Sequence, residues 1–271
     1  MKPQRGDARK LLCAVLAVAT ATVASTIAFA RPADGVAAEP TSPPMIDLRH
    51  QAAVRGDPVA GQQKSELCSA CHGTHGIAVV SFFPNLPGQH IDYLYWRLVA
   101  FRDGHYPESP MTPPALSLSD ADMRDLSAFY AQLDPVEAQR AMDNDPDAEP
   151  VVSEPAAAEV LQLGEQLYRD GDPAKGIPAC QGCHGADARG YTAATRRDGS
   201  GRMPFAAFPS LRHQHRDYLV ARLEHFHQAG GPHSTSNDLV MDLVASHAGS
   251  PLLDDASIQA LAAWLAALPP G

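Results

Sequence analysis

Four of the five cysteines lie in two short segments that share one pattern, residues 68–72 (Cys-Ser-Ala-Cys-His) and 180–184 (Cys-Gln-Gly-Cys-His). Cys-x-x-Cys-His is the attachment signal for a c-type haem. The two thiols add across the two vinyl groups of one haem, and the adjacent imidazole becomes the proximal ligand of the iron. The sequence therefore predicts two covalent haem c groups, with thioether bonds and iron ligands from Cys68, Cys71, His72, Cys180, Cys183 and His184.

Two other kinds of site use paired cysteines. A thioredoxin-like redox pair needs a βαβ context, which the sequence pattern does not provide. A zinc site built from two Cys-x-x-Cys pairs needs no histidine directly after each pair. The repeated histidine therefore favours haem.

The charge balance excludes one class of partner. The chain of 271 residues has 21 Lys and Arg against 31 Asp and Glu, for a formal net charge of −10. A surface that neutralises phosphates is not expected, so we predict no nucleic-acid binding. An acidic carrier can instead be steered toward a basic patch on a protein partner.

The N-terminus has the composition of an export signal. A basic segment, residues 1–10, precedes an uncharged run from Leu11 to Ala30, and this run ends in Ala-Phe-Ala. This pattern predicts a secretory signal over residues 1–30, cut after Ala30, and a periplasmic protein. The alternative is an uncleaved membrane anchor, since 20 uncharged residues are just enough to span a bilayer. Cys13 is interpreted as a small apolar residue of this run.

Five segments are expected from the local patterns. After the signal comes a flexible leader rich in Pro, Ala and Glu, and further on an acidic, proline-rich linker separates two domains. The expected ranges are 1–30 for the signal or anchor, 31–50 for the leader, 51–134 for domain 1, 135–156 for the linker and 157–271 for domain 2.

Helices are expected on both sides of the first motif. A helix begins at Pro58 and runs into the motif, another covers residues 90–102, and a third begins at Ser119, where Ser-x-x-Asp resembles a capping box. Met123 is placed on the core-facing side of that helix. The sequence thus predicts an all-α fold.

The second half repeats the first. Residues 83–101 align with 208–226 at an offset of 125, and the last helices align at an offset of 135. About ten residues are therefore inserted between Phe226 and Leu252. One fold has been duplicated.

An electron carrier needs a second axial ligand, because a six-coordinate iron excludes oxygen and peroxide. A thioether favours ferrous iron and raises the potential. Met111 lies in a proline-rich loop between two expected helices and is the candidate in the first half.

Each half resembles a class I cytochrome c, and the tandem pair resembles the dihaem cytochrome c4 family from about residue 50 to the end. The matches include Cys-His-Gly at residues 71–73 and 183–185, Phe-Pro-Asn-Leu-Pro-Gly-Gln at 83–89, Leu-Ser-Asp at 118–120 with Ala-Phe-Tyr at 128–130, and residues 167–180. The resemblance implies two tandem class I domains, each wrapped around one haem. It also implies that the carbonyls of Pro84 and Pro209 accept hydrogen bonds from Nδ1 of His72 and His184.

The insertion leaves two candidates for the sixth ligand of the second haem. Spacing from the last helix favours His247 if the insertion precedes that residue. It favours Met241 if the turn at residues 248–251 is the insertion. The approach to Met241 over residues 237–241 resembles the ligand loop of the family, so Met241 is preferred. The second half also departs from the family pattern at Arg212 and His213, where the first half has Pro87 and Gly88.

Other aromatic and charged residues have two interpretations each. Tyr93, Trp96 and Tyr218 are candidates for haem walls. Arg97 and Arg222 are candidates for contacts with haem propionates or, equally, for exposed helix positions. The histidines at 213, 215, 225, 227 and 233 suggest a metal site, but no Cys or carboxylate spacing supports it, so a solvated face is favoured.

These expectations point to an exported electron carrier and not to an enzyme. The resemblance implies donation to a membrane haem-copper terminal oxidase after acceptance from a quinol-oxidising complex or dehydrogenase. One alternative is a haem subunit of a membrane-associated dehydrogenase complex, with membrane association through the N-terminal segment or the partner. A dihaem enzyme such as a peroxidase would need an open iron position or a dedicated catalytic base.

Overall fold

The computed structural model describes residues 43–48, 51–147, 155–190, 208–227, 233–247 and 250–271. The expected signal lies outside these residues. Among the described residues, no helix is long and apolar enough to cross a bilayer.

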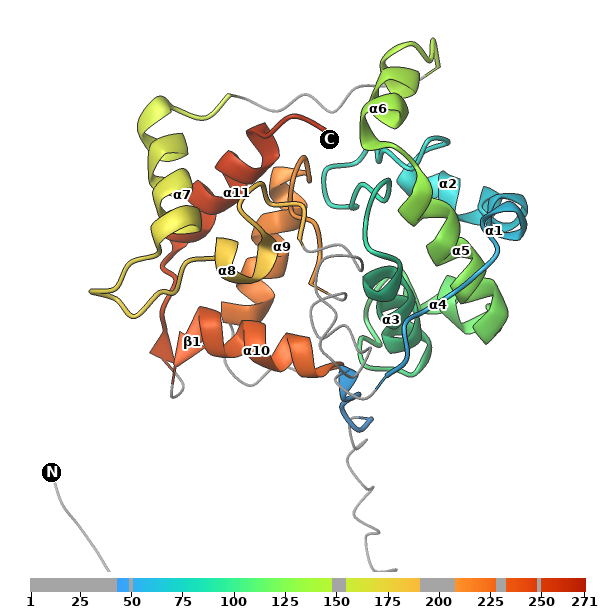
Figure 1. The fold of residues 1–271 in the computed structure, drawn as a ribbon, viewed down its shortest axis with the longest axis horizontal. Coiled ribbons are helices and arrows are strands. Elements are labelled where there is room, and N and C mark those ends of the chain that lie inside the picture. Colours follow the sequence, from blue (N-terminus) through green and yellow to red (C-terminus); the bar gives the residue numbers. More distant parts are fainter. Residues whose placement is uncertain (1–42, 49–50, 148–154, 191–207, 228–232, 248–249) are drawn as a thin grey trace, which may run out of the picture. The chain divides into compact units, whose positions relative to one another are not determined.

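Within this part of the chain nearly all regular structure is helical (Figure 1). The first half contains α1 (Pro58–Lys64), α2 (Glu66–His72), α3 (Ile91–Arg102), α4 (Thr112–Leu116), α5 (Asp120–Gln132) and α6 (Pro135–Asp143). The second half contains α7 (Ala158–Asp170), α8 (Gln181–His184), α9 (Arg216–His227), α10 (Ser236–Ala245) and α11 (Asp255–Ala267). A two-residue antiparallel pair, β1 (Ser246–His247) and β2 (Ser250–Pro251), lies between α10 and α11. The prediction of an all-α fold is confirmed.

Polar caps set the starts of the helices that matter for the site. Asp57 accepts from the backbone N–H groups of the first turn of α1, where Pro58 needs no such partner. Ser119 and Asp122 form the predicted capping box at the start of α5. A second capping box, which the sequence analysis did not identify, joins Thr235 and Asp238 at the start of α10.

Each half is built on a close crossing between its first and its last long helix. In the first half α1 packs on α5, and in the second α7 packs on α11. A glycine stands at each crossing: a Cβ on Gly61 would lie 2.1 Å from the Asp125 carbonyl oxygen, and one on Gly164 would lie 2.1 Å from that of Ala260. The two backbones therefore approach more closely than any side chain would allow.

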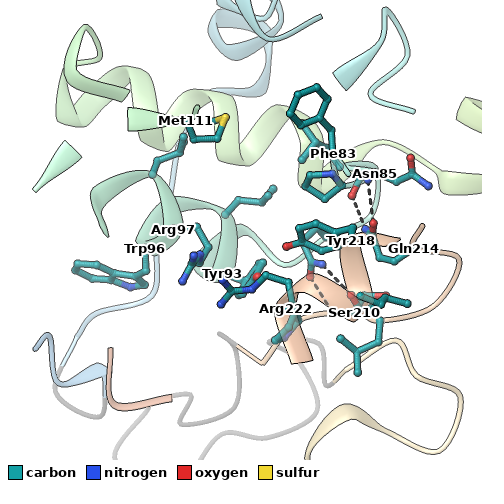
Figure 2. Close-up of a pocket in the computed structure, with 18 of the residues that line it drawn as sticks. Phe83, Asn85, Tyr93, Trp96, Arg97, Met111, Ser210, Gln214, Tyr218 and Arg222 are labelled. Atoms are coloured by element: carbon teal, nitrogen blue, oxygen red, sulfur yellow. Dashed lines mark hydrogen bonds between the residues drawn. The ribbon is translucent and has the colours of Figure 1, made fainter. Parts of the chain in front are cut away.

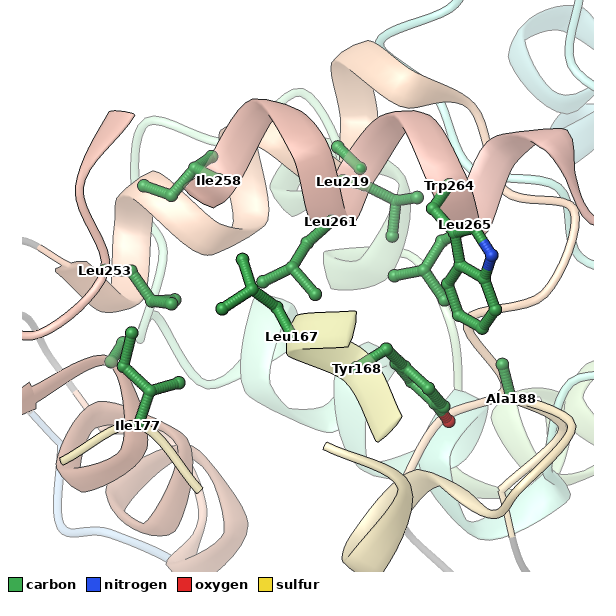
Figure 3. Close-up of a cluster of buried hydrophobic side chains, with 12 residues drawn as sticks. Leu167, Tyr168, Ile177, Ala188, Leu219, Leu253, Ile258, Leu261, Trp264 and Leu265 are labelled. Carbon is green, nitrogen blue, oxygen red and sulfur yellow. The ribbon is translucent and has the colours of Figure 1, made fainter. Parts of the chain in front are cut away.

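The second half contains the largest apolar core of the described residues (Figure 3). Side chains from α7, α9 and α11 meet there, including Leu167, Tyr168, Leu219, Ile258, Leu261 and Leu265. The first half has smaller clusters, one around Tyr95, Val99 and Met123 and another around Leu126 and Phe129. Met123 is fully buried, as its helical position predicted.

The expected flexible leader and the expected interdomain linker both contain residues that make tertiary contacts. Residues 135–143, the start of the expected linker, form α6, because Asp134 caps the helix and Pro135 opens it. Ala138 and Met142 are buried against Ile77. In the expected flexible leader, Ile46 forms a parallel bridge with Thr235. The composition of these segments is typical of linkers, but tertiary contacts stabilise a short helix in one and an extended stretch in the other.

Candidate haem sites

The two cysteine motifs lie at equivalent places in the two halves. Cys68, Cys71 and His72 belong to α2, and Cys183 and His184 to α8, with Cys180 as its N-cap. None of these four cysteines forms a disulfide. A spacing of three residues on a helix brings both thiols of a motif to one side, next to the imidazole.

Both imidazoles are fixed by a backbone carbonyl. Nδ1–H of His72 donates to the Pro84 oxygen over 2.9 Å, and Nδ1–H of His184 donates to the Pro209 oxygen over the same distance. A proton on Nδ1 leaves Nε2 with a lone pair, which is the form that binds a metal. Burial lowers the pKa of both histidines, against the opposing effect of the carbonyl. Burial thus favours the neutral form of both rings.

A cavity of about 580 Å³ connects the two motifs. Its lining includes His72 and His184, and also Met111 and Met241 (Figure 2 shows Met111). Most of the other lining residues are apolar or aromatic, and Phe83 and Phe208 lie 6.1 Å from the rings of His72 and His184, respectively, between ring centroids. Of the four cysteines, Cys68 is in this lining. An apolar cavity with an imidazole and a thioether from each half, next to the two cysteine motifs, fits the ligation of two haem groups.

Met111 and Met241 lie in different kinds of local structure. Met111 lies in the turn before α4, within the proline-rich loop that the sequence predicted. Met241 lies inside α10, so the expected ligand loop over residues 237–241 is a helix. His247, the alternative to Met241, belongs to β1, but its side chain is outside the described part of the structure.

Aromatic and basic side chains from equivalent helices meet between the two halves. Tyr93 and Arg97 of α3 lie opposite Tyr218 and Arg222 of α9, and all four line the cavity (Figure 2). Burial and the neighbouring Tyr218 raise the pKa of Tyr93. The side chain of Arg97 is only 12% exposed, so the interpretation of this residue as an exposed helix position is wrong.

The halves are joined by two matching sets of hydrogen bonds. Gln214 accepts from the backbone N–H of Asn85 over 2.9 Å and donates to its carbonyl over 2.6 Å. Gln89 does the same to Ser210, at 2.8 and 2.9 Å (Figure 2). Since 85 and 210, and 89 and 214, are equivalent in the repeat, each half offers the other the same contact. The halves are thus related by an approximate twofold.

Three of the histidines expected on a solvated face are packed against other groups. Nε2 of His213 contacts the Gln139 amide oxygen over 2.9 Å, and Nε2 of His215 contacts the Ala78 carbonyl over 2.9 Å. His225 packs against the Tyr106 ring, and burial, reinforced by Arg222, lowers the pKa of His225 to about 4. The solvated-face interpretation is wrong for these three, because they lie where residues of one half meet residues of the other. In the described part of the chain, no three or more of His, Cys, Asp and Glu are grouped as a metal site.

The buried residues around the start of α10 are not among those that the sequence predicts for the site. Asp238 is 8% exposed and lies among Ser234, Tyr106 and Arg97. The capping box Thr-x-x-Asp at residues 235–238 was a readable signal for the helix, but nothing local indicated the cross-half contacts.

Comparisons with known proteins agree with this arrangement. A family model described as cytochrome c matches residues 161–269. Cytochrome c4 of Thiocapsa roseopersicina is 38% identical over 183 residues, covering 66% of this chain and 81% of that protein. A protein of Thiomonas intermedia named thiosulfate dehydrogenase electron acceptor is 32% identical, covering 78% of this chain and 82% of that protein. The crystal structure of reduced recombinant cytochrome c4 from Pseudomonas stutzeri matches with a TM-score of 0.57 and 28% identity, covering 79% of this chain and all of the other.

Proposed function

Because the chain belongs to the cytochrome c4 family, and so is an electron-transfer protein with two covalent haem c groups, we propose that it is a periplasmic carrier. It takes electrons from a quinol-oxidising complex or a dehydrogenase and passes them to a terminal oxidase. The predicted export signal supports the compartment.

The observation that carries the proposal is the pairing of one fixed imidazole with one thioether in each half. His72 and Met111 line the cavity in the first half, and His184 and Met241 line it in the second. We assign these four residues as axial ligands, and Cys68, Cys71, Cys180 and Cys183 as attachment points. The bound haem supplies a one-electron couple. The protein holds the imidazoles through Pro84 and Pro209, and the apolar lining excludes water.

With haem bound, one imidazole and one thioether on each iron would leave no position for a substrate. The reduced protein should therefore bind carbon monoxide poorly and turn over peroxide negligibly. The test is oxidation of the reduced protein by oxygen in the presence of membranes that contain a terminal oxidase, with and without an oxidase inhibitor. Inhibitor-sensitive oxidation is expected. Rapid peroxide consumption by the purified protein alone would place it among the dihaem enzymes.

A second candidate function is that of electron acceptor for one particular dehydrogenase, and the Thiomonas intermedia relative favours it. Carrier and dedicated acceptor share every motif, so the two must be separated by their partners. Purification under mild conditions should yield the chain alone if it is a mobile carrier, and a stoichiometric dehydrogenase if it is a permanent subunit. Anaerobic reduction by that dehydrogenase with thiosulfate would then test the substrate.

The ligand of the second haem is tested by its charge-transfer band. Met241→Ala should remove the band that arises from methionine sulfur on ferric iron in the second haem, while His247→Ala leaves it. The reverse pattern would make His247 the ligand, and the potential of the second haem would then be lower, because imidazole favours ferric iron more than a thioether does.

A further inference from the structure

The helix that carries Met241 lies between Phe226 and Leu252, where the second half is about ten residues longer than the first. Its C-terminal end belongs to the second half: Ala245 is fully buried in the core of that half, and α10 packs on α9. Its N-terminal end is held by residues that are distant in the sequence.

Two residues of the first half hold the carboxylate of Asp238. Oδ2 of Asp238 accepts from the Tyr106 hydroxyl over 3.3 Å and lies 3.6 Å from Nη1 of Arg97. The same oxygen accepts from Ser234 and, over 3.2 Å, from the backbone N–H of Thr235. Arg97 and Asp238 have side chains only 12% and 11% exposed, so water does not replace these contacts readily.

The leader holds the same turn from another direction. The backbone N–H of Ile46 donates to the Ser234 carbonyl over 2.9 Å, and that of Ser236 donates to the Ile46 carbonyl over 2.9 Å. The backbone N–H of Leu48 donates to the Ser236 hydroxyl over 3.1 Å. Ser236 is the first residue of α10, whose N–H has no partner within the helix, so the leader satisfies a donor that the helix leaves open.

Met241 lies three residues after Asp238, which on a helix is about 4.5 Å along the axis and close to the same side. A helix held at both ends cannot shift or rotate its middle turn without breaking one set of contacts. We propose that the first half, through Tyr106 and Arg97, and the leader, through Ile46, position Met241 on the iron of the second haem by clamping the first turn of α10. Asp238 is then a positioning residue that acts through the helix.

This inference rests on Met241 being the ligand, so the experiment includes Met241→Ala. The probe is imidazole, which displaces a weakly held thioether from ferric haem. The measured quantity is the intensity of the methionine-to-ferric-iron charge-transfer band of the full-length oxidised protein. Each haem with a methionine ligand contributes half of this intensity. Met241→Ala should lack the part of the second haem before any imidazole is added. A full band in this variant would refute the ligand assignment, and the inference with it.

If Met241 is the ligand, Asp238→Ala should lose the second haem's contribution to the band at an imidazole concentration about tenfold lower than the natural chain does. A tenfold change is typical of the coupling between two linked sites. The first haem's part should be unchanged. Tyr106→Phe removes one hydroxyl and Ile46→Pro one N–H, so each should shift the titration in the same direction by a smaller factor. If Asp238→Ala does not fold, these two variants test the proposal in its place.

The matched control is Ser81→Ala. It removes a hydrogen bond of 2.5 Å to Asp217 that also joins the two halves but does not involve α10. This variant should titrate like the natural chain. If the variants of Asp238, Tyr106 and Ile46 also titrate like the natural chain while Met241→Ala lacks half of the band, the clamp does not position Met241. An equal shift in Ser81→Ala would likewise overturn the inference, because any loosening between the halves would then have the same effect.

Discussion

Replacing Gln214 with alanine should destabilise the protein more than the same change at its repeat partner Gln89. Both amides make two hydrogen bonds to the backbone of the other half. Asn85 is only 7% exposed, whereas Ser210 is half-buried. Loss of Gln214 therefore leaves a buried N–H and a buried C=O without partners, at roughly 1–3 kcal/mol each, so we expect about 2–6 kcal/mol in total. At Ser210 water can take over, and about 1–2 kcal/mol is expected for Gln89→Ala.

The measurement is guanidinium unfolding of the haem-loaded protein, followed by helical circular dichroism and by haem absorbance. Gln132→Ala, an exposed glutamine at the end of α5, is the control and should change the free energy of unfolding by less than about 0.5 kcal/mol. Equal losses for Gln89→Ala and Gln214→Ala would contradict the argument from burial. Losses as small as that of the control would show that these bonds do not stabilise the contact between the halves.

Three further results are expected. Gly164→Ala places a Cβ against the Ala260 carbonyl oxygen and should cost about 1–3 kcal/mol in the free energy of unfolding, whereas Gln162→Ala on the exposed face of α7 should cost little. Hydrogen bonds from Lys64, then from Ser119, hold the pKa of Asp122 at about 2, below an unfolded value of about 3.9. The stabilisation is thus complete above about pH 4 and lost as the pH falls toward 2; Asp122→Asn should flatten this part of a stability profile measured by thermal unfolding. Denatured, acid-extracted protein should retain two haems by mass spectrometry, and Cys183→Ala should weaken only the second attachment; a single haem in the natural chain would refute the assignment of two sites.

The helices and the two haem motifs could be predicted from the sequence because their signals are local. Asp57-Pro58 and Ser119-x-x-Asp122 each mark the start of a helix by residues no more than four positions apart. Each Cys-x-x-Cys-His segment contains both attachment cysteines and the iron ligand within five residues. The repeat at an offset of 125 then extended the interpretation of one half to the other. Such features require no knowledge of which distant segments meet.

The residues that were misread depend on contacts between distant segments. In the sequence His215 belongs to a group of histidines typical of a polar surface. In the structure its ring is hydrogen-bonded to the carbonyl of Ala78, which lies 137 residues earlier. Asp134 and Pro135 are local signals for the start of α6, but the acidic, proline-rich composition of the residues that follow is typical of a linker. Met241 is helical because Thr235 and Asp238 cap α10. The buried partners of Asp238, Arg97 and Tyr106, lie more than 130 residues earlier in the sequence. No local pattern contains that information.

The approximate twofold between the halves has a consequence for how strong their contact must be. Residues 144–157 join α6 to α7, so the two faces never separate into bulk solution. A tether of this length maintains an effective concentration on the order of millimolar. Two free copies would have to overcome the full loss of translational freedom, which generally requires a large apolar area. The tethered halves need no such area, so polar contacts such as those of the two glutamine amides with backbone groups contribute usefully to holding them together. A duplicated chain can therefore keep polar, directional contacts between its halves, which fix their mutual orientation more strictly than an apolar surface would.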